Sequence, residues 1–430
     1  MLFSNIEILD EQFEHHTGCY VGIRDYQIAY IGKELPKEDF GEVYDGTGKL
    51  LMPGFVNAHS HSAMTLMRGY GENLALADWL NTRIFPFEAK LDGTAVYNGC
   101  MLAAAEMLRF GVVSTTDMYF YGEETAKAVI ESGIKMNFSL GTTCFDDRGL
   151  RELPIYHETM DTMRRFHNAE NGRMKVDLAI HAEYTNTPRV VEDMAELAKE
   201  TGLNMHLHLS ETKAEHEACK ERHGGKTPAR YFYDAGVFDA RTTAAHCVWL
   251  EGDDFELMRE KGVTVACNPV SNLKLASGFC PAPLMLEKGL NVALGTDGVA
   301  SNNNLNMLEE IKLFATLFKG TTGDPAAITP KQALYAATRA GALSQGREDC
   351  GLLKEGYRAD LIVLDLQKKP YLRPCHDMVN NVVFSAMGTD VCLTMVDGKV
   401  LYRDGLYTTL DPERVAYQAE QSVQKILSQL

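Results

Sequence analysis

The sequence predicts an α/β fold in which a (β/α)8 barrel carries a small β domain built from both ends of the chain. Three observations predict it. Short apolar runs recur and end in polar or ionisable residues, segments with helical spacing of apolar residues lie between them, and both ends of the chain have strand patterns. With 430 residues, 45% of them hydrophobic, the chain is long enough to bury a substantial core.

Eight apolar runs are the expected barrel strands: 51–62, 112–118, 136–144, 176–184, 203–212, 242–249, 263–272 and 291–302. Helical patterns separate them at 95–110, 124–133, 158–167, 191–202, 255–262 and 283–289, and the last run is followed by a helix expected over 306–319. Active sites of such barrels lie at the C-terminal ends of the strands. The polar residues that close the runs are therefore expected to meet at one mouth.

The two ends of the chain contain hairpin patterns at 21–31 and 391–402. The second includes Asp397-Gly398, a strong signal for a type I′ turn. A polar amphipathic helix is expected from about Pro412. We predict a composite β domain of residues 1–53 and 351–430, with the barrel of residues 54–350 inserted between its halves; two separate β caps are the alternative.

Composition limits the partners of the chain. The 42 basic and 59 acidic side chains give a formal charge of -17, which disfavours nucleic acid and anionic membranes and favours a small neutral or cationic ligand. A signal peptide pattern and a membrane-spanning apolar run are both missing, so a cytoplasmic protein is expected. The ten cysteines form no Cys-x-x-Cys pair and are expected to be reduced. A homo-oligomer is left open.

Histidines gather at the expected strand ends. His59 and His61 are two residues apart, so in a strand they project to the same side. Six of the thirteen histidines lie on these polar tails: His59, His61, His181, His206, His208 and His246. Asp297 adds a carboxylate. This donor set suits Zn²⁺, Fe²⁺ or a similar divalent ion better than Ca²⁺ or Mg²⁺, and half-buried histidines bonded to neighbours are the alternative.

Glu211 follows His208 by three residues, where the fifth strand gives way to a loop. A carboxylate there can overlook a metal without binding it, which is the position for a proton shuttle beside an activated water. The alternative is a helix started by Ser210, with Glu211 in its first turn.

Two other metal motifs are excluded. His181-Ala-Glu183 resembles half of a cytidine deaminase zinc motif, but the chain lacks the Pro-Cys-x-x-Cys half. His216-Glu217 lacks the second histidine of a zincin, because position 220 is lysine.

An ordered set of motifs resembles the amidohydrolase superfamily, and more narrowly its 5′-methylthioadenosine/S-adenosylhomocysteine deaminases. The motifs are Pro53–His61, His206–Thr212, Ala245–Cys247, Asn268–Lys274, Gly295–Asn302 and Gly356–Leu361, and the similarity runs over essentially the whole chain. The resemblance implies a distorted (β/α)8 barrel with a composite β-sandwich domain. It also implies a hydrolase that deaminates adenosine-type nucleosides with one divalent ion per chain, zinc before iron or manganese.

The resemblance also implies roles for residues in and around the cluster. According to the resemblance, the metal ligands are His59, His61, His208 and Asp297. It places His246 beside the attacking water, makes Glu211 the proton shuttle, and gives substrate contacts to Glu88 at the ribose and His181 at the purine or ribose. Our mechanistic hypothesis adds that Asp297 accepts the proton of the water. From the residues alone, Glu88 would be a solvated helix residue and His181 a structural histidine. Strand geometry does not choose between His206 and His208.

The chain departs from the family after the third strand. Many members have an arginine there for a substrate carboxylate, where this chain reads Ser139-Leu-Gly-Thr142. Arg148 and Arg151 are nearby substitutes. S-adenosylhomocysteine is therefore less secure as a substrate than 5′-methylthioadenosine, 5′-deoxyadenosine or adenosine, whose 5′ groups carry no carboxylate.

Two rival functions stay open. A deaminase or amidohydrolase of another heterocycle, such as guanine, a pterin, a triazine or a cyclic amide, would use the same barrel. Binuclear members bridge two metals with a lysine at the third or fourth strand end, and Thr142–Cys144 and His181–Glu183 contain none. A binding module without catalysis is disfavoured because binding alone does not require Glu211 together with Asp297.

Overall fold

Parallel strands form a closed (β/α)8 barrel in the computed structural model, which describes residues 1–367 and 369–430. In chain order they are β6 (Phe55–Ser60), β7 (Val112–Tyr119), β8 (Lys135–Leu140), β9 (Met174–Val176) with β10 (Leu178–Ile180), β11 (Met205–Leu209), β12 (Thr242–His246), β13 (Thr264–Cys267) and β14 (Asn291–Leu294). β9 and β10 are one strand interrupted at Asp177, and Thr142 bridges to Ile180 across the gap between the two parallel sheets. The backbone N–H of Asp297 donates to the carbonyl of His59 at 2.9 Å and ties the last strand end to the first.

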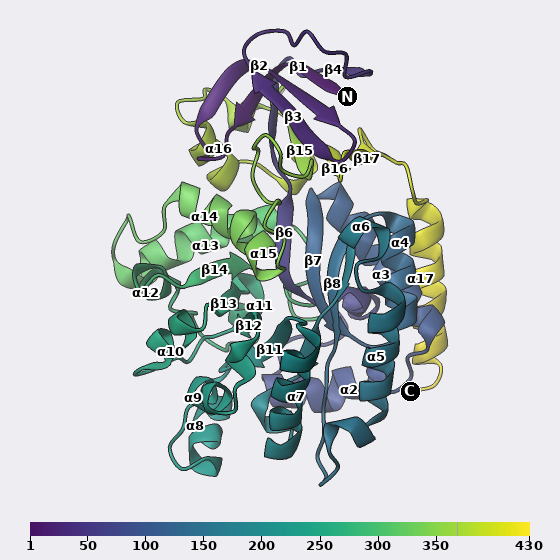
Figure 1. Cartoon of the computed structure of the whole chain (residues 1–430), viewed down its shortest axis with the longest axis vertical. Coiled ribbons are helices and arrows are strands. Elements are labelled where there is room, and N and C mark those ends of the chain that lie inside the picture. The colour runs from purple at the N-terminus through teal and green to yellow at the C-terminus, as the bar shows by residue number, and fades with distance from the viewer. Residues whose placement is uncertain (368) are drawn as a thin grey trace.

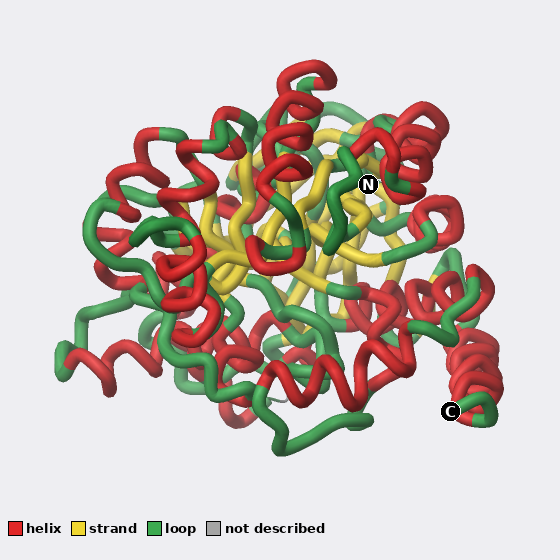
Figure 2. Tube along the Cα trace, turned by 90° about the horizontal axis from the view of Figure 1, so that it is seen from below, coloured by secondary structure: helices red, strands yellow, loops and turns green. Residues whose placement is uncertain are grey.

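Helices surround the strands, as Figure 2 shows from below. They include α3 (Gly93–Arg109), α4 (Gly122–Ser132), α5 (Pro154–Phe166), α7 (Pro188–Thr201), α8 (Lys213–Arg222), α9 (Pro228–Asp234), α10 (Asp254–Glu260), α12 (Ala282–Glu287), α13 (Met307–Thr322), α14 (Pro330–Ala337) and α15 (Arg339–Ser344). Further helices are α1 (Leu76–Trp79), α2 (Phe85–Glu88), α6 (Ala169–Gly172), α11 (Pro269–Lys274) and α16 (Met378–Phe384). The predicted barrel is confirmed.

The terminal strands share one sheet at one end of the barrel (Figure 1). They are β1 (Leu2–Leu9), β2 (His15–Arg24), β3 (Gln27–Gly32), β4 (Val43–Asp45), β5 (Lys49–Pro53), β15 (Leu361–Asp365), β16 (Val391–Val396), β17 (Lys399–Arg403) and β18 (Leu406–Tyr407). β5 pairs with β15, so strands from the two ends of the chain lie side by side and the alternative of two separate caps is wrong. Both hairpins are confirmed, and Asp397 and Gly398 have φ values of 46° and 73°, as a type I′ turn requires.

The first predicted strand, 51–62, is in fact divided between the two sheets. β5 ends at Pro53 and β6 begins at Phe55, with Gly54 between them. A Cβ at Gly54 would lie 2.3 Å from a methyl group of Val113, so only glycine fits this junction.

The C-terminal helix α17 (Pro412–Leu427) is where the sequence places it, and it packs along α3 of the barrel. Asn98 Nδ2 on α3 donates to Ser422 Oγ on α17 at 3.0 Å. The predicted domain limits at residues 53/54 and 350/351 stay a prediction.

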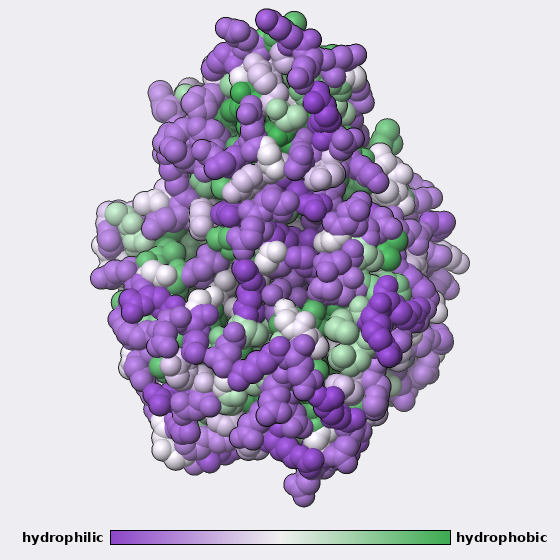
Figure 3. All heavy atoms as spheres, in the orientation of Figure 1, coloured by the Kyte–Doolittle hydropathy of each residue, from purple (hydrophilic) through white to green (hydrophobic). Residues whose placement is uncertain are grey.

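The face drawn in Figure 3 is mainly hydrophilic, with apolar atoms in small groups. In the described part of the chain, every helix is too short or too polar to cross a membrane.

Candidate metal-dependent active site

Three strand ends at the mouth have left-handed backbone at residues other than glycine. Ser210 follows β11 with φ 48°, His246 ends β12 with φ 71°, and Asp297 follows β14 with φ 62°. Such residues cost about 1–3 kcal/mol each and persist where the surrounding structure holds them. This conformational free-energy cost therefore falls on the strand ends where the expected site residues lie.

Four of the imidazoles predicted at strand ends form a buried cluster with Asp297. The donor atoms of His59, His61 and His208 lie within 4.8 Å of one another, and so do those of His59, His246 and Asp297. Nε2 of His59 lies 3.4 Å and Nε2 of His61 lies 3.3 Å from Oδ1 of Asp297. His59 is fully buried, and its Nε2 has no hydrogen-bond partner among the described residues.

The second ring nitrogen of each histidine is held by a partner behind the cluster. Nδ1 of His61 donates to the carbonyl of Met118 at 2.6 Å, and Nδ1 of His208 donates to the carbonyl of His181 at 2.6 Å. These bonds fix the tautomer and leave Nε2 of both rings facing the cluster, as in metal-binding histidines.

Asp297 is ionised in this setting. Burial alone would raise the pKa of its carboxyl, but contacts from His59 and His61 outweigh burial and hold the pKa well below its ordinary value. Its Oδ2 also accepts from Ser271 Oγ at 2.6 Å. The chain therefore provides an oriented carboxylate that faces the imidazoles.

Glu211 lies beside the cluster and outside the helix that follows. Thr212, not Ser210, caps α8, which removes the alternative of a helix-initiating Ser210. Oε2 of Glu211 is 3.8 Å from Nε2 of His246, and Ser277 Oγ donates to Oε1 at 3.1 Å. Burial raises the pKa of Glu211, although His246 partly opposes this shift. A carboxyl with a raised pKa is suited to carry a proton.

These groups open into one cavity of about 340 Å³ whose wall is mostly apolar. Glu88 from α2 and His181, which follows β10, line the same cavity as His61, Glu211 and Asp297. Burial raises the pKa of Glu88 to about 7, with Tyr119 and His61 lowering it less. Both residues expected to contact substrate thus lie in the cavity rather than on the outer surface.

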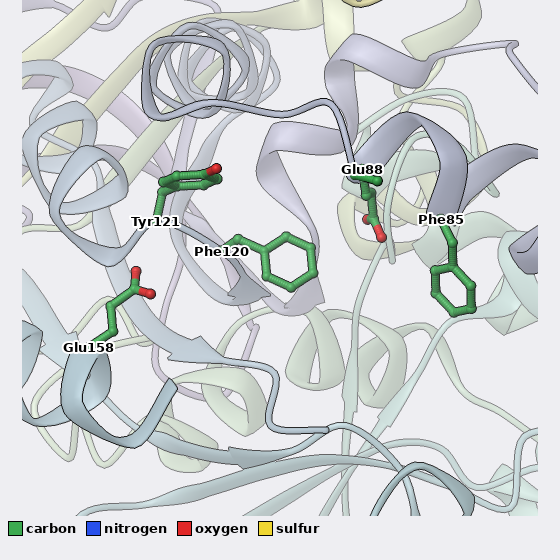
Figure 4. Close-up of a pocket in the computed structure, with 6 residues that line it drawn as sticks. Phe85, Glu88, Phe120, Tyr121 and Glu158 are labelled. Carbon is green, nitrogen blue, oxygen red and sulfur yellow. The ribbon is translucent and has the colours of Figure 1, made fainter. Parts of the chain in front are cut away.

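A second, outer pocket of about 500 Å³ adjoins the cavity and shares Glu88, Phe85 and Phe120 with it. Figure 4 shows Phe85 and Glu88 on one side of it and Phe120, Tyr121 and Glu158 on the other. The ring of Phe120 separates the two carboxyl groups in this view. Glu88 therefore lines both spaces.

Arg148 and Arg151 do not line the cavity. Arg148 makes a two-pronged ion pair with Asp146 at 2.8–3.0 Å, and Arg151 pairs with Glu200 at 2.7 Å. The described lining residues include no lysine or arginine.

Several residues outside the predicted ligand set hold the cluster in place. Nε2 of His206 lies 2.9 Å from Nδ1 of His59, and Asn272 Oδ1 lies 2.8 Å from Nδ1 of His246. Glu215 accepts from the backbone N–H groups of Ser210 and Glu211 at 3.1 and 3.0 Å. Ser271 and Asn272 belong to the motif 268–274, and this motif is the sequence feature that could have indicated their supporting role.

The residues fit a divalent metal. Buried imidazole nitrogens and one carboxylate are ligands for zinc and similar ions, and the unpartnered Nε2 of His59 is the orphaned atom that such an ion would satisfy. A (β/α)8 barrel with this cluster at its C-terminal mouth defines the class of metal-dependent barrel hydrolases.

The chain belongs to the amidohydrolase family, whose model matches residues 50–401. It is 44% identical to a 5-methylthioadenosine/S-adenosylhomocysteine deaminase of Dictyoglomus thermophilum over 91% of each chain. It is 43% identical to a 5′-deoxyadenosine deaminase of Methanosarcina mazei over 95% of this chain and 94% of the relative. A zinc-bound adenosine deaminase structure from Xanthomonas campestris superimposes with a TM-score of 0.92 at 28% identity, covering 99% of this chain and 98% of that one.

Proposed function

We propose that the protein hydrolyses the amino group from the adenine ring of adenosine-type nucleosides and releases ammonia and the inosine-type product. One observation carries the proposal: Glu211 and Asp297 both lie beside histidines of the cluster, His246 and His61 respectively, in one cavity that Glu88 also lines. The deaminase relatives, at 43–44% identity over more than nine tenths of the chain, support the same reaction.

The metal ligands in this proposal are His59, His61, His208 and Asp297, for one zinc ion per chain, with iron or manganese as alternatives. Such an ion, when bound, supplies a Lewis acid that makes water nucleophilic near neutral pH. Asp297, whose carboxyl pKa is held low by His59 and His61, takes up the proton of the attacking water. His246, fixed by Asn272, orients the oxygen and stabilises the charge that develops on it.

Glu211 acts as the proton shuttle. Burial raises its pKa, which favours the protonated form, and this form delivers its proton to the adenine ring nitrogen next to the amino-bearing carbon. The protonated ring is more electrophilic at that carbon, so water adds there. The proton that Asp297 took from the water then passes to the amino group, so the carbon–nitrogen bond breaks, ammonia leaves and the hypoxanthine ring forms.

Glu88 and His181 are assigned to the nucleoside. The Glu88 carboxylate accepts hydrogen bonds from the ribose hydroxyls, and His181 contacts the purine or ribose. Both line the cavity beside the cluster. A ribose ligand favours a nucleoside over the free bases and triazines that were left open by the sequence.

The 5′ substituent in this proposal is neutral. Phe120, Phe145 and Tyr184 give the cavity an aromatic wall, and its described charged groups are carboxylates and histidines. Arg148 and Arg151 are occupied by their own ion pairs. A carboxylate-bearing tail would be desolvated without a partner, which costs free energy. We therefore place 5′-methylthioadenosine, 5′-deoxyadenosine and adenosine ahead of S-adenosylhomocysteine.

The test is ammonia release from a panel of these four nucleosides, guanine, a pterin and a triazine. Highest kcat/KM for a nucleoside with a neutral 5′ group supports the whole proposal. Highest kcat/KM for S-adenosylhomocysteine would refute the tail preference alone. Turnover of a free heterocycle with none of the nucleosides would refute the substrate class.

A further inference from the structure

A polar cavity of about 320 Å³ lies at the end of the barrel remote from the active site. Its walls come from the turn 168–172, from Lys175 at the start of the fourth barrel strand, and from residues 346–350, with Arg358 on the side of the terminal sheet. Figure 1 labels α6 and α15, which bound this region, toward the terminal sheet. No step of the proposed reaction uses this cavity.

Two cations in its wall lack a carboxylate within ion-pair distance in the described part of the chain. Arg347 is 6% exposed, and its guanidinium donates only to uncharged acceptors: the carbonyls of Gly172, Met136 and Arg173 and the side-chain oxygens of Asn137 and Gln345. Nζ of Lys175 donates to the carbonyl of Gly346 at 2.9 Å. A buried charge without an opposite partner is costly, and proteins normally pair it.

Two carboxylates lie near these cations, and one of them, Asp349, also lines the cavity. Asp349 pairs with Nε of Arg358 at 3.1 Å, and the same guanidinium contacts Asp397 at 3.0 Å. Asp177 is close enough for Lys175 and Arg347 to lower the pKa of its carboxyl, but it accepts from the amide of Asn137 at 2.9 and 3.1 Å and makes no ion pair with either cation among the described residues. Arg347 and Lys175 thus line an open space without an ion pair of their own in the described part of a chain whose formal charge is -17.

We propose that this cavity binds a phosphate-type oxyanion, held by Arg347 and Lys175. A dianion matches the two cations, and the amide groups of Asn168 and Asn171 line the same space and add neutral donors for its remaining oxygens. Because Arg358 belongs to the segment that leads into the terminal sheet, a bound anion would stabilise the junction between this sheet and the barrel without touching the active site.

Titration calorimetry of the metal-loaded full chain with inorganic phosphate tests the site. Lys175→Gln is the main variant because Lys175 is only half-buried, whereas a change at buried Arg347 would confound binding with folding. Lys312→Gln is the matched control, since Lys312 is exposed on α13. We expect saturable binding to the wild type and the control, and affinity at least about 10-fold weaker in the variant.

Thermal unfolding in phosphate against chloride at equal ionic strength gives a second readout. Phosphate stabilises most proteins weakly by exclusion from their surface, so the wild type and Lys175→Gln share that effect. A bound anion should add a rise in the wild-type midpoint that the variant lacks. Deamination by both should be equal, because the cavity is remote from the catalytic groups.

If Lys175→Gln fails to fold, Asn171→Asp replaces it, because this exposed residue would bring a negative charge to the cavity. Glycerol 3-phosphate in the same titration distinguishes the source: binding of phosphate alone assigns a site for the free ion, and binding of both assigns a site for monoesters. Absence of saturable phosphate binding, or equal affinity in the wild type and these variants, would overturn the proposal.

Discussion

Nε2 of His206 lies 2.9 Å from Nδ1 of His59, in the fully buried layer directly behind the candidate metal cluster. Both residues point into the barrel, and His206 lies two residues before His208 on β11. The same strand therefore provides one imidazole that faces the cluster and one that supports another strand's imidazole from behind.

His206→Leu should weaken metal binding, because His59 would lose the acceptor that keeps its Nε2 free for the metal. Partners of this kind contribute about 10–100-fold to metal affinity. Competition with a chelator measures the change, and excess metal should restore activity. Ser139→Ala is the control, since it removes only the 3.4 Å contact at the other nitrogen of His206. Unchanged affinity in His206→Leu would exclude this supporting role.

Glu211→Gln should keep the metal and lose turnover. The amide cannot shuttle a proton, and a general acid or base contributes about 10²–10⁴-fold to rate. Stopped assays of ammonia and elemental analysis of the same sample measure both properties. The matched control is Glu217→Gln, at a more exposed glutamate on α8. Near-normal kcat in Glu211→Gln would remove the shuttle from the mechanism.

Substrate binding should improve as pH rises through about 7. Burial raises the pKa of Glu88 to about 7, so below that pH the carboxyl is protonated and is a poorer acceptor for ribose hydroxyls. KM for adenosine should therefore fall with rising pH in the wild type. In Glu88→Gln, KM should be about 10-fold higher, since a hydrogen bond to a charged group contributes about 1.5–3 kcal/mol. The fall of KM with rising pH should also be lost.

Two comparisons isolate this effect from other titrations. A 2′,3′-dideoxy nucleoside lacks the hydroxyls, so its KM should change neither with pH through about 7 nor with the Glu88→Gln substitution. Glu158→Gln, on the other side of the outer pocket, should leave KM unchanged. Equal sensitivity of both nucleosides to Glu88→Gln would argue for a structural role of the carboxyl.

Lys135→Met should strongly destabilise the chain. Lys135 starts β8, is fully buried, and pairs with Asp360 and with Asp397, the latter at 2.7 Å. Removing the cation leaves two buried carboxylates, and breaking a buried pair costs about 3–5 kcal/mol. Denaturant unfolding measures the loss. Lys127→Met, at an exposed pair with Glu123, should change stability by less than about 1 kcal/mol. Similar losses in both variants would contradict the special position of Lys135.

Removal of the metal should abolish deamination and leave a folded chain whose barrel is held by its own core. Dialysis against a chelator, followed by circular dichroism and then by addition of zinc, iron or manganese, measures activity lost and regained. About one equivalent of metal per chain is expected. Full activity after complete removal would contradict the proposed chemistry.

Much of this architecture could be predicted because the barrel repeats one local pattern. Each strand is apolar and each mouth residue is polar, so periodicity alone separates 112–118 or 242–249 from the helices between them. The hairpin at 391–402 was equally readable, since Asp397-Gly398 has few other conformations available.

Other features depend on contacts between residues far apart in the chain, so the local sequence does not predict them. The division at Gly54 is set by Val113 and Asp360, which lie far along the chain. α8 has a polar sequence without a clear apolar stripe, so its helical pattern was not visible, although Thr212 and Glu215 form a capping box. The difference between His206 and His208 arises from depth in the barrel, which alternation along a strand does not encode.

The amino terminus lies in the sheet at the closed end of the barrel, where the Met1 ammonium donates to the carbonyl of Ile23 at 3.0 Å. The catalytic mouth opens at the opposite end. A chain attached to a solid support through an exposed residue of the terminal sheet would consequently present the cavity of the active site to the bulk solution.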